Sequence, residues 1–102
     1  MNGLLPEERY LYLSQPGNLS QLADKLSEES GKEYSTIIRM FHKAVESELS
    51  ERENYVFRMY YLYGKSIMNI TMELGSQYVR IENNLKKGYQ KLLKFFKNYS
   101  ED

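Results

Sequence analysis

The chain has 102 residues, 41% of them hydrophobic, which suits a folded protein with a modest core. It has no Cys, and this excludes disulfides, thiolate metal ligands and a thiol nucleophile. Its formal net charge is zero, no apolar run reaches the roughly 18 residues of a membrane span, and no signal-peptide core follows Met1. We therefore expect a cytoplasmic protein that does not enter a membrane.

The two halves of the chain carry opposite net charge. Residues 1–50 have five Lys or Arg and eight Asp or Glu, a net charge of −3, whereas residues 51–102 have nine and six, a net charge of +3. A basic surface attracts polyanions, and an acidic surface repels them. The second half is therefore the better candidate for contact with a polyanion.

Pro and Gly are few, and they separate segments in which apolar residues recur with the period of a helix. This pattern predicts an all-α fold of about six helices. In the first half, the expected helices cover about 6–15, 18–26 and 33–48. Pro6 suits the first turn of the first helix, Asn18 or Ser20 caps the second, and the polar segment 27–31 connects it to the third. The predicted inner side of the third helix consists of Tyr34, Ile37, Ile38, Phe41, Ala44 and Val45.

In the second half, the expected helices cover about 51–63, 66–74 and 77–97. A capping box of Ser50 and Glu53 starts the first of them, and Gly64 is its expected C-terminal cap. Ser66 opens the second helix, and Gly75 ends it. The predicted inner sides consist of Tyr55, Val56, Met59, Tyr60, Tyr63, Ile67, Ile70, Leu74, Ile81, Leu85, Gly88, Leu92 and either Phe95 or Phe96.

Residues 66–88 have the layout of a helix-turn-helix, in which a short helix, a tight turn and a second helix follow one another. Gly75 and Ser76 form the turn, where Gly accepts a positive φ without a Cβ clash. The apolar residues that would pack the two helices at a steep angle are Ile70, Leu74, Ile81 and Leu85. The second half is therefore predicted to be a three-helix unit that binds DNA.

The outward side of the second motif helix has the side chains that major-groove recognition requires. Asn and Gln pair bidentately with adenine, and Arg with guanine, whereas Lys and hydroxyl groups contact phosphates. The residues expected to face the groove are Gln77, Tyr78, Arg80, Asn83, Asn84 and Lys87, with base contacts from Gln77, Arg80 and the two Asn. The residues expected to contact phosphates are Lys65, Ser66, Lys86, Lys87 and Lys91.

The motifs of the second half occur in the order of a known family. A Leu with an acidic-basic helix start, Leu49 to Glu53, precedes a helix rich in apolar and Tyr residues, and Gly64 follows it. An Ile-to-Gly stretch, Ile70 to Gly75, comes next. The anchors of the last helix are Ile81, Leu85, Gly88 and Leu92. With these motifs, residues 49–95 resemble the fourth conserved region of bacterial sigma factors. The resemblance implies a helix-turn-helix that binds the −35 promoter element and contact with RNA polymerase.

The first half repeats part of this spacing. Gly31 precedes an Ile by six residues, as Gly75 does. Two interpretations stay open: residues 1–48 and 49–102 are tandem helix-turn-helix units, or an ordinary pair of amphipathic helices matches the spacing by chance. In the tandem case, a second DNA-binding face consists of Lys32, Ser35, Thr36, Arg39 and Lys43.

Catalytic and metal-binding patterns are missing from the sequence. His42 is the only His, no Cys accompanies it, and Glu46 and Glu48 lack the spacing of a metal-binding loop. We find no Gly-rich phosphate loop, nucleophile elbow or paired catalytic carboxylates. We therefore expect no enzymatic activity, no metal and no cofactor.

Two functions of different classes remain. The first is a sequence-specific transcription regulator, of a small prokaryotic, phage or mobile-element type, that binds double-stranded DNA. A single helix-turn-helix rarely holds DNA tightly, so a homodimer, a second motif or RNA polymerase would contribute the remaining contacts. The second function is a helical adaptor that binds a protein through the same scaffold. The basic second half favours the first function, and the neutral net charge and Glu82 favour the second.

Overall fold

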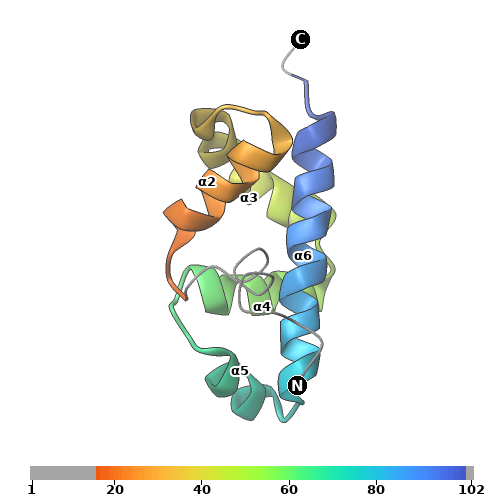
Figure 1. Cartoon of the computed structure of the whole chain (residues 1–102). Helices are drawn as coiled ribbons and strands as arrows, with labels where there is room; N and C mark the ends of the chain where they lie inside the picture. Colours follow the sequence, from red (N-terminus) through yellow and green to blue (C-terminus); the bar gives the residue numbers. More distant parts are fainter. Residues whose placement is uncertain (1–15, 101–102) are drawn as a thin grey trace, which may run out of the picture.

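The computed structural model describes residues 16–100, and the helix expected at 6–15 lies outside them. The described part contains five α-helices and no strand, so the predicted all-α class is confirmed. The helices are α2 (Leu19–Ser30), α3 (Tyr34–Glu48), α4 (Glu51–Tyr61), α5 (Ile67–Leu74) and α6 (Tyr78–Asn98). Helix α6 forms the long axis of the molecule: α5 lies at its beginning, α4 beside its middle and α2 and α3 beside its second half (Figure 1).

Short polar side chains start the helices, as the sequence predicts. The Asn18 side chain caps α2 by accepting a hydrogen bond from the Gln21 N–H at 3.0 Å. The predicted capping box of α4 is present: the Glu53 N–H donates to Ser50 Oγ at 3.2 Å, and the Ser50 N–H donates to Glu53 Oε1 at 2.9 Å. Ser66 caps α5 in the same way. These local signals explain why α2, α4 and α5 begin where they do.

The expected connection 27–31 is wrong, because α2 continues to Ser30. Gly31 alone leaves the helix, with a φ of 76° in the left-handed region. Its N–H donates to the Ser27 carbonyl oxygen at 3.0 Å, which closes the last turn. The polar residues before Gly31 therefore lie within the helix, and the turn between α2 and α3 is short.

Helix α4 ends two residues earlier than expected, at Tyr61, and Gly64 is not its cap. The N–H groups of Leu62 and Tyr63 both donate to the Arg58 carbonyl oxygen, which closes the last turn. Gly64 has a φ of 70° in the loop that follows. Gly64, the glycine that the sequence predicts as a cap, thus has a left-handed conformation, but it lies in the loop between α4 and α5.

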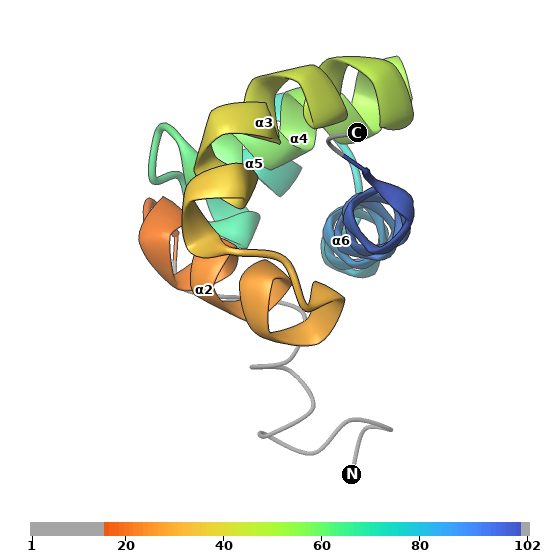
Figure 2. The same ribbon diagram turned by 90° about the horizontal axis from the view of Figure 1, so that it is seen from above.

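One hydrophobic core extends through all five helices, and residues from both halves of the chain contribute to it. Viewed along α6, helix α2 lies on one side of the core and α3 and α4 lie on another (Figure 2). Four residues that we expected on inner sides are instead exposed: Tyr34, Ile38, Tyr55 and Tyr63. The first three lie at the margins of apolar stripes, and Tyr63 lies beyond the end of α4, so neighbouring helices cover them only in part.

Helices α4 and α6 cross closely because α6 has a glycine at the crossing. A Cβ on Gly88 would lie 2.8 Å from Cδ1 of Phe57, whose ring is buried. Any larger residue at this position would therefore collide with the ring. The close crossing therefore fixes how near α4 lies to α6, the helix that carries the candidate site.

Candidate nucleic-acid interface

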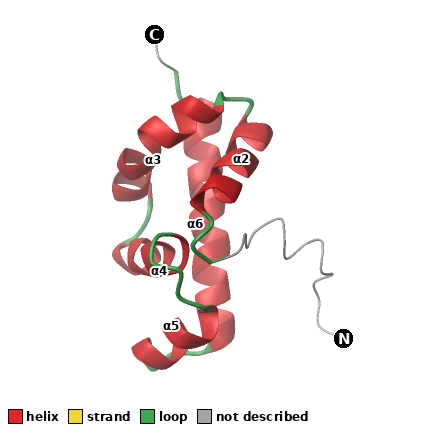
Figure 3. Ribbon diagram, turned by 90° about the vertical axis from the view of Figure 1, so that its left-hand side faces the viewer, coloured by secondary structure: helices red, strands yellow, loops and turns green. Residues whose placement is uncertain are grey.

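Helices α5 and α6 are joined by a turn of three residues, 75–77. Gly75 adopts the predicted left-handed conformation, with a φ of 60°, and the Ser76 N–H donates to the Thr71 carbonyl oxygen at 3.0 Å. Ile70 and Ile81 are fully buried between the helices. As a result, α5 lies across the first turns of α6 (Figure 3).

Most residues predicted to face a DNA groove are exposed at the start of α6. Gln77 is the N-cap residue, and its side chain makes no capping hydrogen bond. The exposed members of the predicted set are Gln77, Tyr78, Arg80, Asn83 and Lys87. The structure therefore brings these five side chains to the N-cap and the N-terminal half of α6, on the part of the helix that follows the turn from α5.

Asn84 differs from the other predicted residues because its side chain accepts a hydrogen bond from a residue of α4. The Arg52 Nε donates to Asn84 Oδ1 at 3.2 Å, and Arg52 Nη2 donates to Ser76 Oγ at 3.0 Å. Bidentate recognition of adenine needs both the oxygen and the nitrogen of an Asn side chain. Since the oxygen already accepts a bond from Arg52, Asn83 is the better placed amide for base contact.

Arg52 is a residue that the sequence reasoning missed. It lies in the first turn of α4, next to the capping box, and its two partners follow it by 24 and 32 residues. No local spacing connects such residues, because the pairing depends on how α4 crosses α6. The side chain holds both the turn and the second turn of α6 against α4.

Lys65 and Ser66, two of the predicted phosphate contacts, serve the start of α5. Ser66 Oγ accepts the Asn69 N–H, and Lys65 Nζ forms an ion pair with Glu73 Oε2 at 2.9 Å. The hydrogen bond from Lys65 lowers the pKa of Glu73, and the same bond raises the pKa of Lys65. Tyr55 donates a further hydrogen bond to Glu73. Lys65 is thus partly neutralised by its own fold.

Lys91, another predicted phosphate contact, is bound to a buried carboxylate. Its Nζ lies 2.7 Å from Glu53 Oε1, and the Glu53 side chain is only 8% exposed. Burial acts to raise the pKa of Glu53, but the hydrogen bonds from Lys91 and Ser50 outweigh it and hold that pKa below its ordinary value. Lys91 therefore ties α6 to the beginning of α4. Lys86 is half-buried and already interacts with another group.

The second predicted DNA face does not form one continuous exposed surface. Thr36 is buried, with 6% of its surface exposed, so its side chain is unavailable to a ligand. This position turns inward because it lies beside Ile37, at the edge of the buried side of α3. Ser35, Arg39 and Lys43 are exposed on α3, whereas Lys32 is half-buried in the turn before it.

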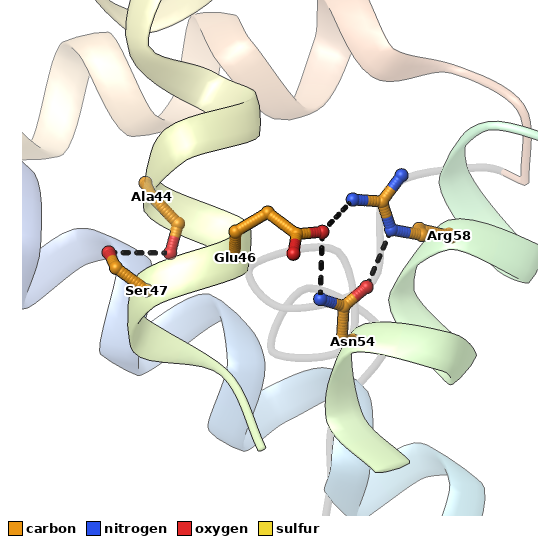
Figure 4. Close-up of polar contacts among 5 residues, drawn as sticks. All are labelled: Ala44, Glu46, Ser47, Asn54 and Arg58. Carbon is orange, nitrogen blue, oxygen red and sulfur yellow. Dashed lines mark hydrogen bonds and ion pairs between the residues drawn. The ribbon is translucent and has the colours of Figure 1, made fainter. Parts of the chain in front are cut away.

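A second polar cluster joins α3 to α4 (Figure 4). Arg58 Nε donates to Asn54 Oδ1 at 2.6 Å, Asn54 Nδ2 donates to Glu46 Oε2 at 3.3 Å, and Arg58 forms an ion pair with Glu46. The hydrogen bonds from Asn54 and Arg58 lower the pKa of Glu46. Helix α4, which holds α6 through Arg52 and Glu53, is therefore itself fixed to the first half of the chain.

The described residues gather no group of three His, Asp or Glu side chains that would hold a metal ion. Across residues 16–100, none of the helices combines the length and the apolar character that crossing a membrane requires. The chain matches no protein-family model, no curated protein and no solved structure. Functional inference for this protein therefore depends on its own geometry and chemistry.

Proposed function

We propose that the protein is a sequence-specific transcription regulator that binds double-stranded DNA, with α5 and α6 acting as a helix-turn-helix. In such a motif the N-terminal part of the second helix enters the major groove. The observation that supports the proposal most directly is the exposed set at the start of α6, above all Arg80 and Asn83. Their side chains suit guanine and adenine, respectively.

The rigidity of the site also supports this function. Specific recognition needs side chains that are held in place before the ligand arrives, because flexible groups lose entropy on binding. Arg52 holds Ser76 and Asn84, and Glu53 holds Lys91, so α4 fixes both the turn and the middle of α6. The recognition helix is thus supported along its length.

The local charge at the site is favourable although the net charge of the chain is zero. The only acidic residue of α6 is Glu82, which is half-buried and already interacts with another group. The opposite sign of charge predominates on α2, where Asp24, Glu28 and Glu29 outnumber Lys25. Since the potential near a surface depends on nearby charges more than on the net charge, α6 can attract a polyanion.

The experiment that tests the proposal is fluorescence anisotropy with a labelled random-sequence duplex at several salt concentrations, followed by selection of a preferred site. Phosphate contacts release counterions, so we expect binding that weakens steeply as salt rises. On the selected site, Arg80→Ala should lose roughly 1–3 kcal/mol if Arg80 pairs with a base. Arg80→Lys is the matched control, because it keeps the charge but loses the bidentate geometry. Absence of duplex binding at low salt would refute the proposal.

A helical adaptor is the second candidate, and one observation favours it. Met68 and Met72 lie one turn apart on α5 and are 53% and 73% exposed. Exposed apolar side chains on one side of a helix are typical of protein-binding surfaces. If the protein is an adaptor, Met68→Gln with Met72→Gln abolishes partner binding, and no duplex binding is seen in the anisotropy experiment. RNA polymerase, which the sigma-factor resemblance implies as a partner, is the first protein to test.

A further inference from the structure

One unbroken stripe of polar side chains follows the outer side of α6 from its first turn to its last. Its members recur every three or four residues and are all exposed: Arg80, Asn83, Lys87, Gln90, Lys94 and Lys97. This stripe, here called the α6 stripe, lies opposite the buried residues of the same helix, because positions three and four apart share one side of an α-helix. It contains four cations and no carboxylate.

The cations of the α6 stripe differ in their surroundings from four other cations of the fold. Lys25, Arg58, Lys65 and Lys91 each form an ion pair with a glutamate. Within residues 16–100, by contrast, Arg80, Lys87, Lys94 and Lys97 have no ion pair. The fold thus pairs these four cations with its own carboxylates and leaves those of the α6 stripe available to an external anion.

The kinds of side chain change along the stripe. Arg80 and Asn83, at the beginning, suit base edges, whereas the remainder of the stripe carries Lys87, Lys94 and Lys97. A lysine is a flexible point charge that suits phosphate better than a base edge. From Arg80 to Lys97 the helix rises by about 25 Å at 1.5 Å per residue. A straight helix of that length leaves the curved major groove and passes over the sugar-phosphate backbone.

We propose that the later part of the α6 stripe, formed by Lys87, Lys94 and Lys97, binds the phosphate backbone of the same DNA duplex whose major groove receives the beginning of the helix. The inference rests on the proposed function and extends it, because it makes one helix both the base-reading and the backbone-binding element. The C-terminal end of a long recognition helix contacts the backbone in known helix-turn-helix variants. Contacts of this kind position the protein without reading sequence.

An anionic membrane surface is the other polyanion that a lysine stripe would suit. Amphipathic helices bind membranes by inserting their apolar side between lipids. The apolar side of α6 is instead buried in the protein core, through residues such as Leu85, Leu92 and Phe96. Only electrostatic attraction would remain, so the observations favour the duplex.

The test is the double variant Lys94→Gln with Lys97→Gln, compared with wild type by anisotropy from about 50 to about 200 mM salt. Each lost phosphate contact reduces the salt slope by about one, so we expect the slope to fall by about two. When the salt is lowered from about 200 to about 50 mM, wild type should gain about tenfold more affinity than the variant gains. This difference should be the same on random and selected duplexes. The control is Lys25→Gln on α2, which removes a cation that is ion-paired with Glu29 and belongs to neither candidate DNA-binding face, and it should leave the slope unchanged.

The possible results separate the inference from the function on which it rests. If wild type shows no salt-dependent duplex binding, the proposed function fails, and the inference fails with it. If wild type binds but the Lys94 and Lys97 variant keeps its slope, only the inference is overturned. If the salt slope of the control variant falls by as much per removed cation, the effect is one of overall charge, and the inference is likewise overturned. Binding of wild type to phosphatidylserine vesicles but not to duplex would assign the stripe to lipid. Circular dichroism of both variants checks that they fold.

Discussion

Arg52 and Asn84, which are 32 residues apart in the chain, meet where α4 crosses α6: Arg52 Nε donates to Asn84 Oδ1 at 3.2 Å. The same guanidinium reaches Ser76 Oγ in the turn before α6. A planar guanidinium can hold two acceptors at once in a fixed geometry. The pair therefore couples the orientation of the candidate recognition helix to the helix behind it.

Removal of this contact should affect DNA binding more than stability. We expect Arg52→Ala to change the free energy of unfolding by less than about 1 kcal/mol, because the side chain is exposed. Affinity for a selected duplex should fall by roughly fivefold, since α6 loses its orientation. Urea unfolding and anisotropy measure the two effects.

Matched variants identify the cause of that fall. If Arg52 acts through Asn84, the double variant Arg52→Ala with Asn84→Ala should bind the selected duplex no more weakly than either single variant. This non-additivity is what a double-mutant cycle shows for coupled residues. Arg52→Lys keeps the charge but cannot hold both acceptors, so it should resemble Arg52→Ala. Full affinity in Arg52→Lys would instead make Arg52 a simple charge contact.

Acid should destabilise the protein through three carboxylates. The pKa values of Glu46, Glu53 and Glu73 lie below their ordinary value of 4.5 in the folded state. The folded protein thus binds fewer protons than the unfolded chain near that pH, and stability falls as the pH falls through this range. Urea unfolding between about pH 7 and pH 3 measures the trend.

Glu53 offers the cleanest variant for this prediction. Glu53→Gln keeps a side chain that can complete the capping box with Ser50 but loses the charge that attracts Lys91. We expect less stability at neutral pH, by under about 1 kcal/mol because Lys91 is partly exposed, and a shallower fall in acid. Asp24→Asn, at an exposed position of α2, is the control. An unchanged acid profile in Glu53→Gln would contradict the assignment.

The elements predictable from sequence are those whose causes are local. Ser50 and Glu53 are three residues apart, and Gly75 directly follows the helix that it ends, so the sequence contains the whole signal. The same locality explains the predicted exposure of Arg80 and Asn83, which lie opposite the apolar stripe of their own helix. The lysines at the end of that stripe, Lys94 and Lys97, follow the same spacing, so their exposure also has a local cause.

The features that sequence reasoning missed depend on how helices pack. Nothing near Arg52 indicates that its partner is Asn84, and the place of Thr36 at the edge of the apolar stripe does not by itself decide whether α3 buries or exposes this residue. The polar residues before Gly31 predicted a loop on propensity alone, but they continue α2 because Gly31 supplies the left-handed stop. Tertiary context decided each of these cases.

Tyr89 should resist ionisation at alkaline pH. Its hydroxyl donates to Glu29 on α2, and burial together with that carboxylate raises the pKa of Tyr89 above its ordinary value of 10.0. The folded state therefore keeps a proton that the unfolded chain loses, and stability falls as the pH rises past that value. Tyr89→Phe should cost about 1 kcal/mol at neutral pH and flatten the alkaline fall. Tyr63→Phe, at an exposed position, should change neither, and a matching profile in both variants would refute the role of Tyr89.

Gly88→Ala should destabilise the protein although alanine favours helices. Helix propensity alone would stabilise by roughly 1 kcal/mol. The added Cβ, however, would lie 2.8 Å from Cδ1 and 3.0 Å from Cε1 of the buried Phe57 ring, and overpacking of this kind costs roughly 1–3 kcal/mol. We expect a net loss of about 1 kcal/mol in urea unfolding, and a smaller loss when Gly88→Ala is introduced into a Phe57→Leu variant and compared with that variant, because the smaller side chain makes room at the crossing. Because Arg52 and Asn84 meet across the same pair of helices, Gly88→Ala should also weaken duplex binding. A stabilised Gly88→Ala variant would show that α4 and α6 cross less closely than the structure indicates.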